Sequence, residues 1–299
     1  MQKLLLIYNP VSGAGTFSDN LDECVRILQT RGFLVSLYRT ERGGDIESLL
    51  CRAEAKAYST IAAAGGDGTI NRVVNAMVRS GIKKPLGIIC AGTANDLARH
   101  IGVTPDFRSA CRTIAARSIK KMDLGAINGE KYFVNVCAAG MFANISQCVD
   151  QELKNSFGKL AYYIKGLEQI QNPMPLKVRI ATSTEVIEEE LLLFVILNSA
   201  RLGGIRRMCP TARIDDGLFD FIGFRCLRRY ELPALLLKVL SGGCLSDKRI
   251  FFRRDNFFRV ELAEPAKTQL LSTDIDGEPG PKMPIVVQNM PEALEIIAP

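Results

Sequence analysis

The sequence places one carboxylate among three glycines directly after an apolar segment, in the stretch IAAAGGDGTI at residues 61–70. Glycines let the backbone turn sharply and approach a ligand closely, and free N–H groups at the start of a helix attract phosphate. Asp67 would repel a phosphate unless a cation lay between them, and Mg²⁺ favours one or two carboxylates together with water and phosphate oxygens. The stretch therefore predicts a magnesium–phosphate site. The alternative is that Asp67 only caps the helix that follows.

Two other turns in the first third of the chain have a similar composition. Residues 9–13 read NPVSG and residues 92–96 read GTAND, and each follows a short apolar segment. In an open parallel sheet, ligands bind beyond the carboxyl ends of the strands. We therefore expect the three turns to lie together and to bind one ligand, which makes helix capping a weaker explanation of Asp67.

Carboxylates also occur in two turn-like stretches of the second half of the chain. Asp276 and Glu278 flank Gly277, and a positioned carboxylate is a sufficient base for a hydroxyl that accepts a phosphoryl group. The stretch DDG at residues 215–217 precedes another apolar segment. On composition alone, both stretches are typical of surface turns.

Short apolar segments alternate with segments of helical periodicity over the first 120 residues. We predict strands at residues 4–8, 34–38, 60–64 and 86–90. Apolar side chains between them recur at helical spacing, within residues 21–28, 46–57 and 70–78. This alternation is typical of a parallel sheet covered by helices, with the three turns at the carboxyl ends of its strands.

The pattern changes after residue 122. An Asn-Gly pair at 128–129 separates the segments 122–127 and 131–136 and predicts a hairpin. Further strands are predicted at 176–182, 190–197, 218–224, 257–262, 269–274 and 285–288, and helices at 160–171 and 230–240. We therefore predict an α/β domain with a parallel sheet, followed by a second, mostly antiparallel β-sandwich domain.

The composition is that of a globular protein with more than one core. At 299 residues, with 47% hydrophobic and 23% charged residues, two domains are expected. A net charge of +6 is too small to indicate a nucleic-acid-binding protein. Nine cysteines without a C-x-x-C pair predict free thiols in a reducing cytosol, and a single histidine excludes a metal cluster built on histidines. The sequence shows no signal peptide, and its longest apolar run, 191–197, is far shorter than the ~20 residues of a transmembrane helix.

Six motifs, in the order found here, resemble those of the bacterial diacylglycerol kinase and lipid kinase family. They read NPVSG, GGDGTIN, GTAND, MDLG at residues 122–125, the segment 210–220, and DGE at residues 276–278. The family belongs to a superfamily that also contains eukaryotic diacylglycerol kinases, sphingosine kinases, NAD kinases and phosphofructokinases. The resemblance covers essentially the whole chain, and the ordered set is far more specific than GGDG alone.

The resemblance implies an ATP-dependent kinase that uses Mg²⁺ and transfers the γ-phosphate of ATP to a lipid hydroxyl. Diacylglycerol is the expected acceptor and phosphatidic acid the expected product. The nucleotide-binding domain would span residues 1–122, which the segment 290–299 could join, and a β-sandwich lipid-substrate domain would span 123–289. A lipid partner at the membrane surface implies a cytoplasmic protein that associates peripherally with the membrane, and a homodimer is compatible with this arrangement.

The resemblance also assigns roles to individual residues. The positions that contact the nucleotide are Asn9, Ser12, Thr40, Gly65, Gly66, Asp67, Gly68, Thr69, Ile70, Asn71, Arg72, Thr93 and Asn95. The carboxylates associated with the catalytic magnesium and its water network are Asp67, Asp96 and Asp123. Glu278 corresponds to the proton acceptor, and Asp276 to its partner or to a metal-linked carboxylate. A second magnesium site would use Arg213, Asp216 and Leu218, of which only Asp216 contributes its side chain.

Two positions depart from the family pattern. Many members have a basic residue where this chain has Ala14, and bacterial members often have a glutamate where it has Arg72. Arg72 could replace the missing positive charge near the phosphates, or it could be an exposed helix residue. The departures leave open a nucleotide- or lipid-binding regulator that has lost catalysis. NAD kinase shares GGDG, but the NPVSG motif argues against it.

Two basic stretches have open interpretations. The run KRIFFRR at residues 248–254 suits either an anionic bilayer surface or a sandwich strand with a charged outer face. Arg201, Arg206 and Arg207 flank a Gly-Gly pair, and this loop could contact lipid phosphate or ATP, or could simply be solvated.

Overall fold

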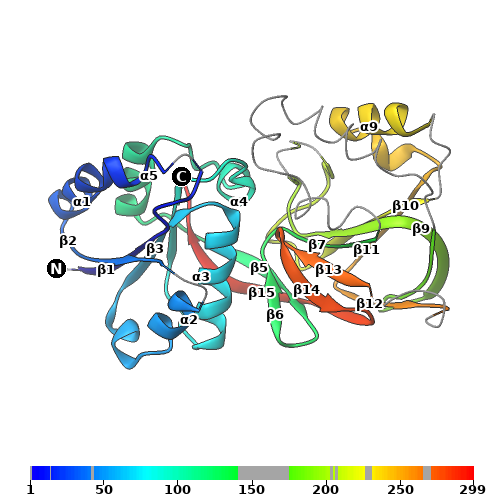
Figure 1. The fold of residues 1–299 in the computed structure, drawn as a ribbon, viewed down its shortest axis with the longest axis horizontal. Helices are drawn as coiled ribbons and strands as arrows, with labels where there is room; N and C mark the ends of the chain where they lie inside the picture. Colours follow the sequence, from blue (N-terminus) through cyan, green and yellow to red (C-terminus); the bar gives the residue numbers. More distant parts are fainter. Residues whose placement is uncertain are drawn as a thin grey trace. The chain divides into compact units, whose positions relative to one another are not determined.

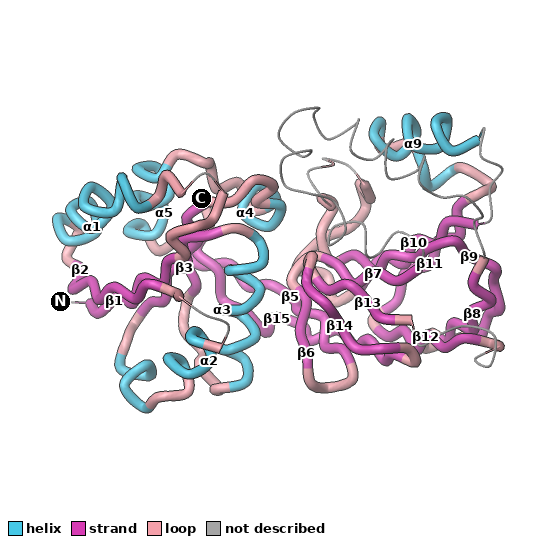
Figure 2. Tube along the Cα trace, viewed as in Figure 1, coloured by secondary structure: helices cyan, strands magenta, loops and turns pink. Residues whose placement is uncertain are grey.

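The structure is a computed structural model that describes residues 2–13, 15–41, 44–140, 175–202, 205, 208–225, 231–264 and 271–299. The chain divides into two compact units: unit 1 is Met1–Leu124 with Pro291–Pro299, and unit 2 is Gly125–Met290. Most of the described helices belong to unit 1 and most of the strands to unit 2 (Figures 1 and 2). The two units are therefore built on different kinds of sheet.

Unit 1 contains a parallel sheet. Its strands run in the order β4-β3-β1-β2, with the bounds β1 (Gln2–Tyr8), β2 (Phe33–Arg39), β3 (Thr60–Gly65) and β4 (Leu86–Cys90). β1 lies between β2 and β3, so that Leu4 is opposite both Val35 and Thr60. The end of β15 (Ile285–Ile297) adds a parallel strand beside β4, with Ile296 opposite Leu86. The four predicted strands are confirmed, and their parallel order brings their carboxyl ends to one edge.

Helices cover both faces of this sheet: α1 (Leu21–Thr30), α2 (Asp45–Leu50), α3 (Asp67–Arg79), α4 (Asp96–His100) and α5 (Phe107–Ala116). α1 packs against α5 on one face, and α2 packs against α3 on the other (Figure 1). A short 3-10 helix, η1 (Ser18–Asn20), precedes α1. The single helix predicted over 46–57 is wrong. Arg52 adopts an extended conformation (φ −73°, ψ 146°), which separates α2 from a second 3-10 helix, η2 (Ala53–Ala57).

Unit 2 is mostly antiparallel. Besides parts of β5 (Ile119–Ile127) and β15, its strands are β6 (Lys131–Phe133), β7 (Val136–Gly140), β8 (Leu176–Ala181), β9 (Val186–Leu197), β10 (Phe219–Arg225), β11 (Ile250–Asp255), β12 (Phe257–Leu262), β13 (Ser272–Ile275) and β14 (Glu278–Lys282). The long β9 pairs with β7, β8 and β10. β13 pairs with β7 on one side and β14 on the other, and β12 pairs with β8 and β15. The predicted antiparallel sandwich is confirmed.

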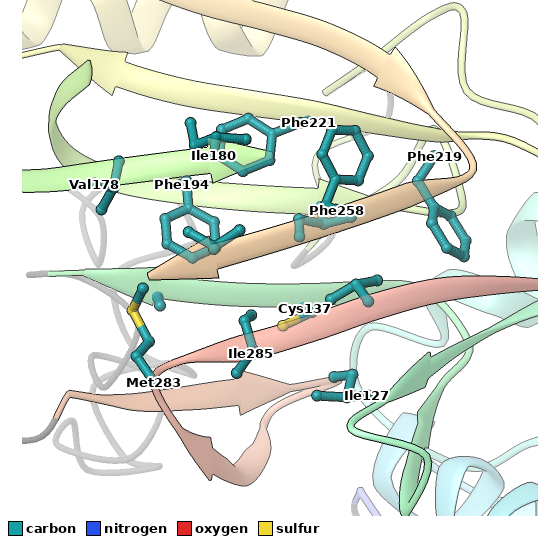
Figure 3. Close-up of a cluster of buried hydrophobic side chains, with 14 of the residues drawn as sticks. Ile127, Cys137, Val178, Ile180, Phe194, Phe219, Phe221, Phe258, Met283 and Ile285 are labelled. Carbon is teal, nitrogen blue, oxygen red and sulfur yellow. The ribbon is translucent and has the colours of Figure 1, made fainter. Parts of the chain in front are cut away.

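The core of unit 2 is aromatic (Figure 3). Phe194 and Phe221 stack with their ring centroids 5.1 Å apart, and Phe258 packs on Phe221 at 5.4 Å. On the other side of β9 and β10, a second apolar cluster includes Leu235 and Val239 of α9 (Leu232–Ser241). Such burial on both faces stabilises these strands through the apolar area removed from water.

Some predicted elements change or lie outside the described residues. The strand predicted at 131–136 is split into β6 and β7. The run KRIFFRR contributes β11, with Phe251 buried in the core, so the sandwich-strand interpretation is correct for this run. The helix predicted at 160–171, residues 269 and 270, Tyr230 and Ala14 lie outside the described residues. In the described part of the chain, no helix has the length and hydropathy needed to span a bilayer.

Candidate functional site

The three glycine-containing turns meet at the carboxyl ends of the strands of unit 1. A Cβ built on Gly13 would lie 2.4 Å from the carbonyl oxygen of Ala91, and one on Gly92 would lie 2.4 Å from the Cα of Gly66. Gly13 also has a φ of +60°, which side chains rarely tolerate. The turns therefore touch through their backbones, and only glycine allows this approach.

Asn9 connects the first turn to the start of α3. Its Nδ2 atom donates to Thr69 Oγ1 at 3.3 Å, and its Oδ1 atom accepts the N–H of Val11 at 3.1 Å. The backbone N–H of Asn9 donates to the carbonyl of Ala64 at 3.0 Å. One residue therefore fixes the ends of β1 and β3 and the first turn of a helix relative to each other.

Asp67 is the first residue of α3. The N-cap position before it is Gly66, which has no side chain that could cap the helix. The Oδ1 atom of Asp67 instead accepts the N–H of Asp96 in the third turn at 2.8 Å. Gly65 also allows a close contact, since a Cβ there would lie 2.5 Å from the Cβ of Thr69. The explanation of Asp67 as only the cap of its own helix is therefore wrong, because its carboxylate also connects two turns.

Asn95 shapes the third turn from within. It has a φ of +50° and is 2% exposed; its Oδ1 atom accepts the N–H of Gly92 at 3.0 Å, and its Nδ2 atom donates to the carbonyl of Gly92 at 2.7 Å. Both polar atoms of this side chain are thus bonded within the turn. Thr93, in contrast, is exposed. Of these two residues predicted to contact the nucleotide, only Thr93 has an exposed side chain, whereas the side chain of Asn95 holds the turn.

The remaining predicted residues of these turns differ in exposure. Ser12 is half-buried, and its N–H donates to the carbonyl of Asn9 at 3.3 Å, which closes the first turn. Gly68 is half-buried, whereas Ile70 and Asn71 are 1% and 7% exposed. Ile70 and Asn71 therefore anchor α3 in the core.

A pocket of about 320 Å³ adjoins the first turn, on the side of β2. Thr40 contributes to it from the end of β2, where its N–H donates to the carbonyl of Tyr8 at 2.9 Å. Arg72 contributes to it from α3. This side chain is half-buried, and its guanidinium lies 3.6 Å from a carboxylate oxygen of Glu47. The interpretation of Arg72 as an exposed helix residue is therefore not correct. The pocket is lined by Asn9, Pro10, Val11, Arg39, Thr40, Glu41 and Arg72.

Two further carboxylates predicted at the magnesium site are buried in unit 1. Asp96 is 6% exposed and Asp123 is 1% exposed. The Oδ1 atom of Asp123 accepts the N–H of Glu292 at 2.8 Å, so this carboxylate fastens the C-terminal strand segment to β5. Within the described ranges, no group of three or more Asp, Glu, His or Cys side chains could hold a metal ion. A magnesium ion here would therefore need phosphate and water oxygens to complete its ligands.

A cysteine next to this site is not a nucleophile. Burial, together with the negative charge of Asp67, raises the pKa of Cys90 to about 11. The thiol at the end of β4 is therefore protonated at neutral pH. Like the other described cysteines of the sheet and its helices, it is a free thiol, as predicted.

The predicted proton acceptor directly follows a two-residue hairpin turn in unit 2. Asp276 (φ +51°) and Gly277 (φ +92°) connect β13 to β14, and positive φ at both positions is the geometry of a type I′ turn. Glu278 is the first residue of β14 and is exposed. The carboxylate of Asp276 accepts three consecutive backbone N–H groups at 2.7, 2.9 and 2.8 Å, those of Val134, Asn135 and Val136. Asp276 therefore positions the turn, and Glu278 is left to face solvent or a ligand.

Both oxygens of Asp216, in the second predicted metal site, have protein partners. Oδ1 accepts the N–H of Leu218 at 3.1 Å, and Oδ2 forms an ion pair with Arg254. The side chain of Arg213 pairs with Asp215 at 3.1 Å. These contacts hold the turn before β10, and the second metal site stays a prediction.

The structure adds residues that the sequence did not single out. Val11, Arg39 and Glu41 line the pocket beside Thr40, and Val11 is 79% exposed. The rule that placed the three turns at strand ends also applies to the end of β2 and could have found Arg39 and Glu41. No local sequence signal indicates Asn135, which contacts Asp276 across 141 positions.

Known proteins resemble this chain over its full length. The diacylglycerol kinase catalytic domain model matches residues 3–127, and the YegS C-terminal NAD kinase beta sandwich-like domain model matches residues 135–298. A diacylglycerol kinase from Bacillus subtilis (strain 168) is 30% identical over 300 residues, which cover 100% of this chain and 97% of that protein. A diacylglycerol kinase from Staphylococcus haemolyticus (strain JCSC1435) is 32% identical, and the match covers 98% of this chain and 87% of that protein.

Solved structures agree with these sequence matches. A crystal structure from Bacillus anthracis str. Sterne aligns with a TM-score of 0.84 and 27% identity, covering 100% of this chain and 95% of that one. A second structure from the same organism is described as that of a diacylglycerol kinase. It aligns with a TM-score of 0.80 and 26% identity, and the match covers 100% of this chain and 97% of that one. Since full-length relatives, both halves of the fold and the ordered motifs agree, the chain belongs to the diacylglycerol kinase family.

Proposed function

We propose that the protein transfers the γ-phosphate of ATP to the hydroxyl of diacylglycerol and so produces phosphatidic acid. The observation that carries the proposal is the contact of three backbone turns around Asp67, with Gly92 and Gly66 too close for any side chain. Turns at strand ends beside the start of a helix suit a chain of phosphates, because the N–H groups of a first helical turn have no acceptor within the helix. The names of the relatives support diacylglycerol as the acceptor.

The nucleotide would bind along the three turns and into the adjoining pocket. Backbone N–H groups at the start of α3, together with Ser12 and the exposed hydroxyl of Thr93, would hold phosphate oxygens. The pocket beside Thr40 and Arg72 has room for part of the nucleoside and offers both apolar and hydrogen-bonding surface. In this proposal the nucleotide contacts the residues that the sequence predicts, except that Asn95 acts by holding the shape of its turn.

The carboxylates at these turns fit a magnesium ion. The bond from the N–H of Asp96 to Asp67 places two carboxylate residues next to each other, and hard oxygen donors suit Mg²⁺. Asp67 and Asp96 would hold the ion, and Asp123 would contribute to its water network. When bound, Mg²⁺ neutralises charge that develops on the transferred phosphoryl group.

Unit 2 would supply the proton acceptor. Glu278 would take the proton of the lipid hydroxyl onto its carboxylate as that oxygen attacks phosphorus, and an exposed carboxylate is accessible to such an acceptor. Asp276 would hold the turn in place through its three N–H contacts.

Because the acceptor is a lipid, the protein would act at the cytoplasmic surface of a membrane. Phe251 of β11 and Phe258 of β12 are 3% and 0% exposed and cannot contact a membrane, whereas Phe252 and Phe257 are half-buried. Peripheral docking and the homodimer stay predictions.

A turnover assay tests the proposal. The purified protein is given radiolabelled ATP, Mg²⁺ and mixed micelles of diacylglycerol, and we expect labelled phosphatidic acid. The same assay with NAD, with a sphingoid base and with phosphatidylglycerol identifies other acceptors. Binding of ATP without label transfer to any acceptor would contradict the kinase proposal and favour a regulator.

A further inference from the structure

Arg201 differs from the other described arginines of unit 2. Each of the others forms an ion pair with a carboxylate: Arg179, Arg213, Arg225, Arg249, Arg253, Arg254 and Arg259. Arg201 is half-buried, and its Nε atom is buried without a hydrogen-bond partner. This guanidinium therefore has one buried donor that no described part of the chain satisfies.

An unsatisfied buried donor is costly, and the cost is larger for a charged group. Such a group is retained where a ligand supplies the missing acceptor. The planar guanidinium fork matches the oxygens of phosphate better than any other side chain does. The partner that best fits Arg201 is thus a phosphate oxyanion from outside the chain.

The backbone at Arg201 is held firmly. The hydroxyl of Ser199 lies 3.1 Å from Asn135 Oδ1 and 3.1 Å from the carbonyl of Arg201. The carbonyl of Ala200 accepts the N–H of Met208 at 3.0 Å. Because its main chain is fixed on both sides, the side chain can bind a ligand with little loss of backbone entropy.

Arg201 follows β9 at the sheet end that carries the Glu278 turn. The strands lie in the order β13-β7-β9. The N–H of Asn198, just after β9, donates to the carbonyl of Asn135 at 2.8 Å, and the N–H of Asp276, just after β13, donates to the carbonyl of Val136 at 3.0 Å. Neighbouring strands are about 4.8 Å apart, so the end of β9 lies about 10 Å from this turn.

We propose that Arg201 binds a phosphate oxygen of the lipid at this end of unit 2. The proposal rests on the proposed function in taking a lipid as the ligand. Two sources of the oxyanion share this chemistry: the phosphate monoester of the product, and the phosphodiester of an anionic lipid that enters as acceptor.

Equilibrium titration of the full chain without ATP tests this binding and separates its sources. The ligands are short-chain phosphatidic acid, phosphatidylglycerol and diacylglycerol, each with two octanoyl chains. Arg201→Met removes the charge and keeps the length, Arg201→Lys keeps the charge, and Arg259→Met is the matched control on an exposed arginine of β12. Thermal melting of each variant shows that it is folded; if Arg201→Met is not, Arg201→Lys and Arg201→Gln are compared instead.

We expect Arg201→Met to lower the affinity for an anionic lipid about tenfold or more, with diacylglycerol unaffected. Arg201→Lys should be intermediate, and Arg259→Met should match wild type. A loss seen with phosphatidic acid alone identifies the product monoester, and a loss seen with phosphatidylglycerol identifies the headgroup diester.

Equal affinity of wild type and Arg201→Met for both anionic lipids overturns the proposal, even where the enzyme transfers phosphate normally. If wild type transfers no phosphate but the loss of affinity is observed, the proposed function fails and the assignment of Arg201 stands.

Discussion

The two units hold their functional turns in different ways. In unit 1, the turns approach backbone to backbone at Gly13, Gly66 and Gly92, with no room for side chains. In unit 2, a side chain is the fastener, since the carboxylate of Asp276 accepts three backbone N–H groups. In unit 2 this contact occupies three main-chain N–H groups next to the exposed side chain of Glu278.

The difference indicates where each unit tolerates change. A unit whose turns contact each other through the backbone should be sensitive to side-chain atoms added at its glycines. It should depend less on the identity of individual side chains. A unit that is fastened by one carboxylate should be sensitive to the loss of that carboxylate. Asp67 and Asn9 are exceptions in unit 1, because their side chains also join the turns.

Asp67 gives the largest expected effect. Asp67→Asn keeps an oxygen that can accept the N–H of Asp96 but removes the negative charge. We expect phosphoryl transfer to fall about 10²-fold or more, while the melting temperature stays close to that of wild type. The measurement is initial rate against Mg²⁺ concentration. Activity near wild type would mean that Asp67 is only a fastener, like Asp276.

Asp276 should affect stability as well as rate. Asp276→Ala leaves three backbone N–H groups without their acceptor, and we expect the free energy of unfolding to fall by about 2–4 kcal/mol. Urea unfolding measures it. Glu278→Gln is the matched control, because Glu278 is exposed and its loss should stop turnover without lowering stability. Equal stability of Asp276→Ala and wild type would remove the proposed fastening role.

Gly92 tests the backbone contact in unit 1. Gly92→Ala introduces a Cβ at 2.4 Å from the Cα of Gly66, and we expect a loss of about 1–3 kcal/mol together with weaker ATP binding. Gly243→Ala is the control, since its nearest atom would be 3.7 Å away. Calorimetric titration with ATP and Mg²⁺ checks the result. If both variants bind ATP like wild type, the turns do not need their close contact.

Asp247 should give the smallest effect, and one that depends on pH. Hydrogen bonds from Arg249 and Lys238 hold the pKa of its carboxyl well below the usual range. A pKa lowered by folding means that the stabilisation is present above the unfolded pKa of about 3.9 and is lost as the pH falls further. Asp247→Asn should therefore cost about 1 kcal/mol at pH 7, and the difference from wild type should shrink near pH 3. A difference that is constant between these pH values would contradict the assignment.

The sequence predicted most of the fold because its signals are local. Strands β1 to β4 follow from short apolar runs, and the turn at Asp67 follows from three glycines next to one carboxylate. β11 was harder to predict, since its basic residues and aromatic residues also suit a membrane surface. The structure resolves this by pairing Arg253 with Glu185 and burying Phe251.

The contacts that the sequence could not predict join distant positions. Asp276 binds the backbone near Asn135, and Asp123 binds the N–H of Glu292, 169 positions later. Neither contact has a periodic pattern or a local motif, because each depends on how the strands are ordered in the sheet. The ion pairing of every other described arginine in unit 2, which makes Arg201 distinctive, is likewise visible only in three dimensions.

The strand segment Pro291–Pro299 belongs to unit 1 although it follows the whole of unit 2 in the chain. It adds to the sheet beside β4, and the N–H of Ala298 donates to the carbonyl of Ser118 at 3.0 Å. During synthesis on the ribosome, unit 1 therefore cannot complete its sheet until residues 125–290 have been made. A fragment that stops at residue 124 would expose one side of β4 as an unpaired edge, which is a site for aggregation. Unit 2, whose residues are continuous in the sequence, is the better candidate for expression alone.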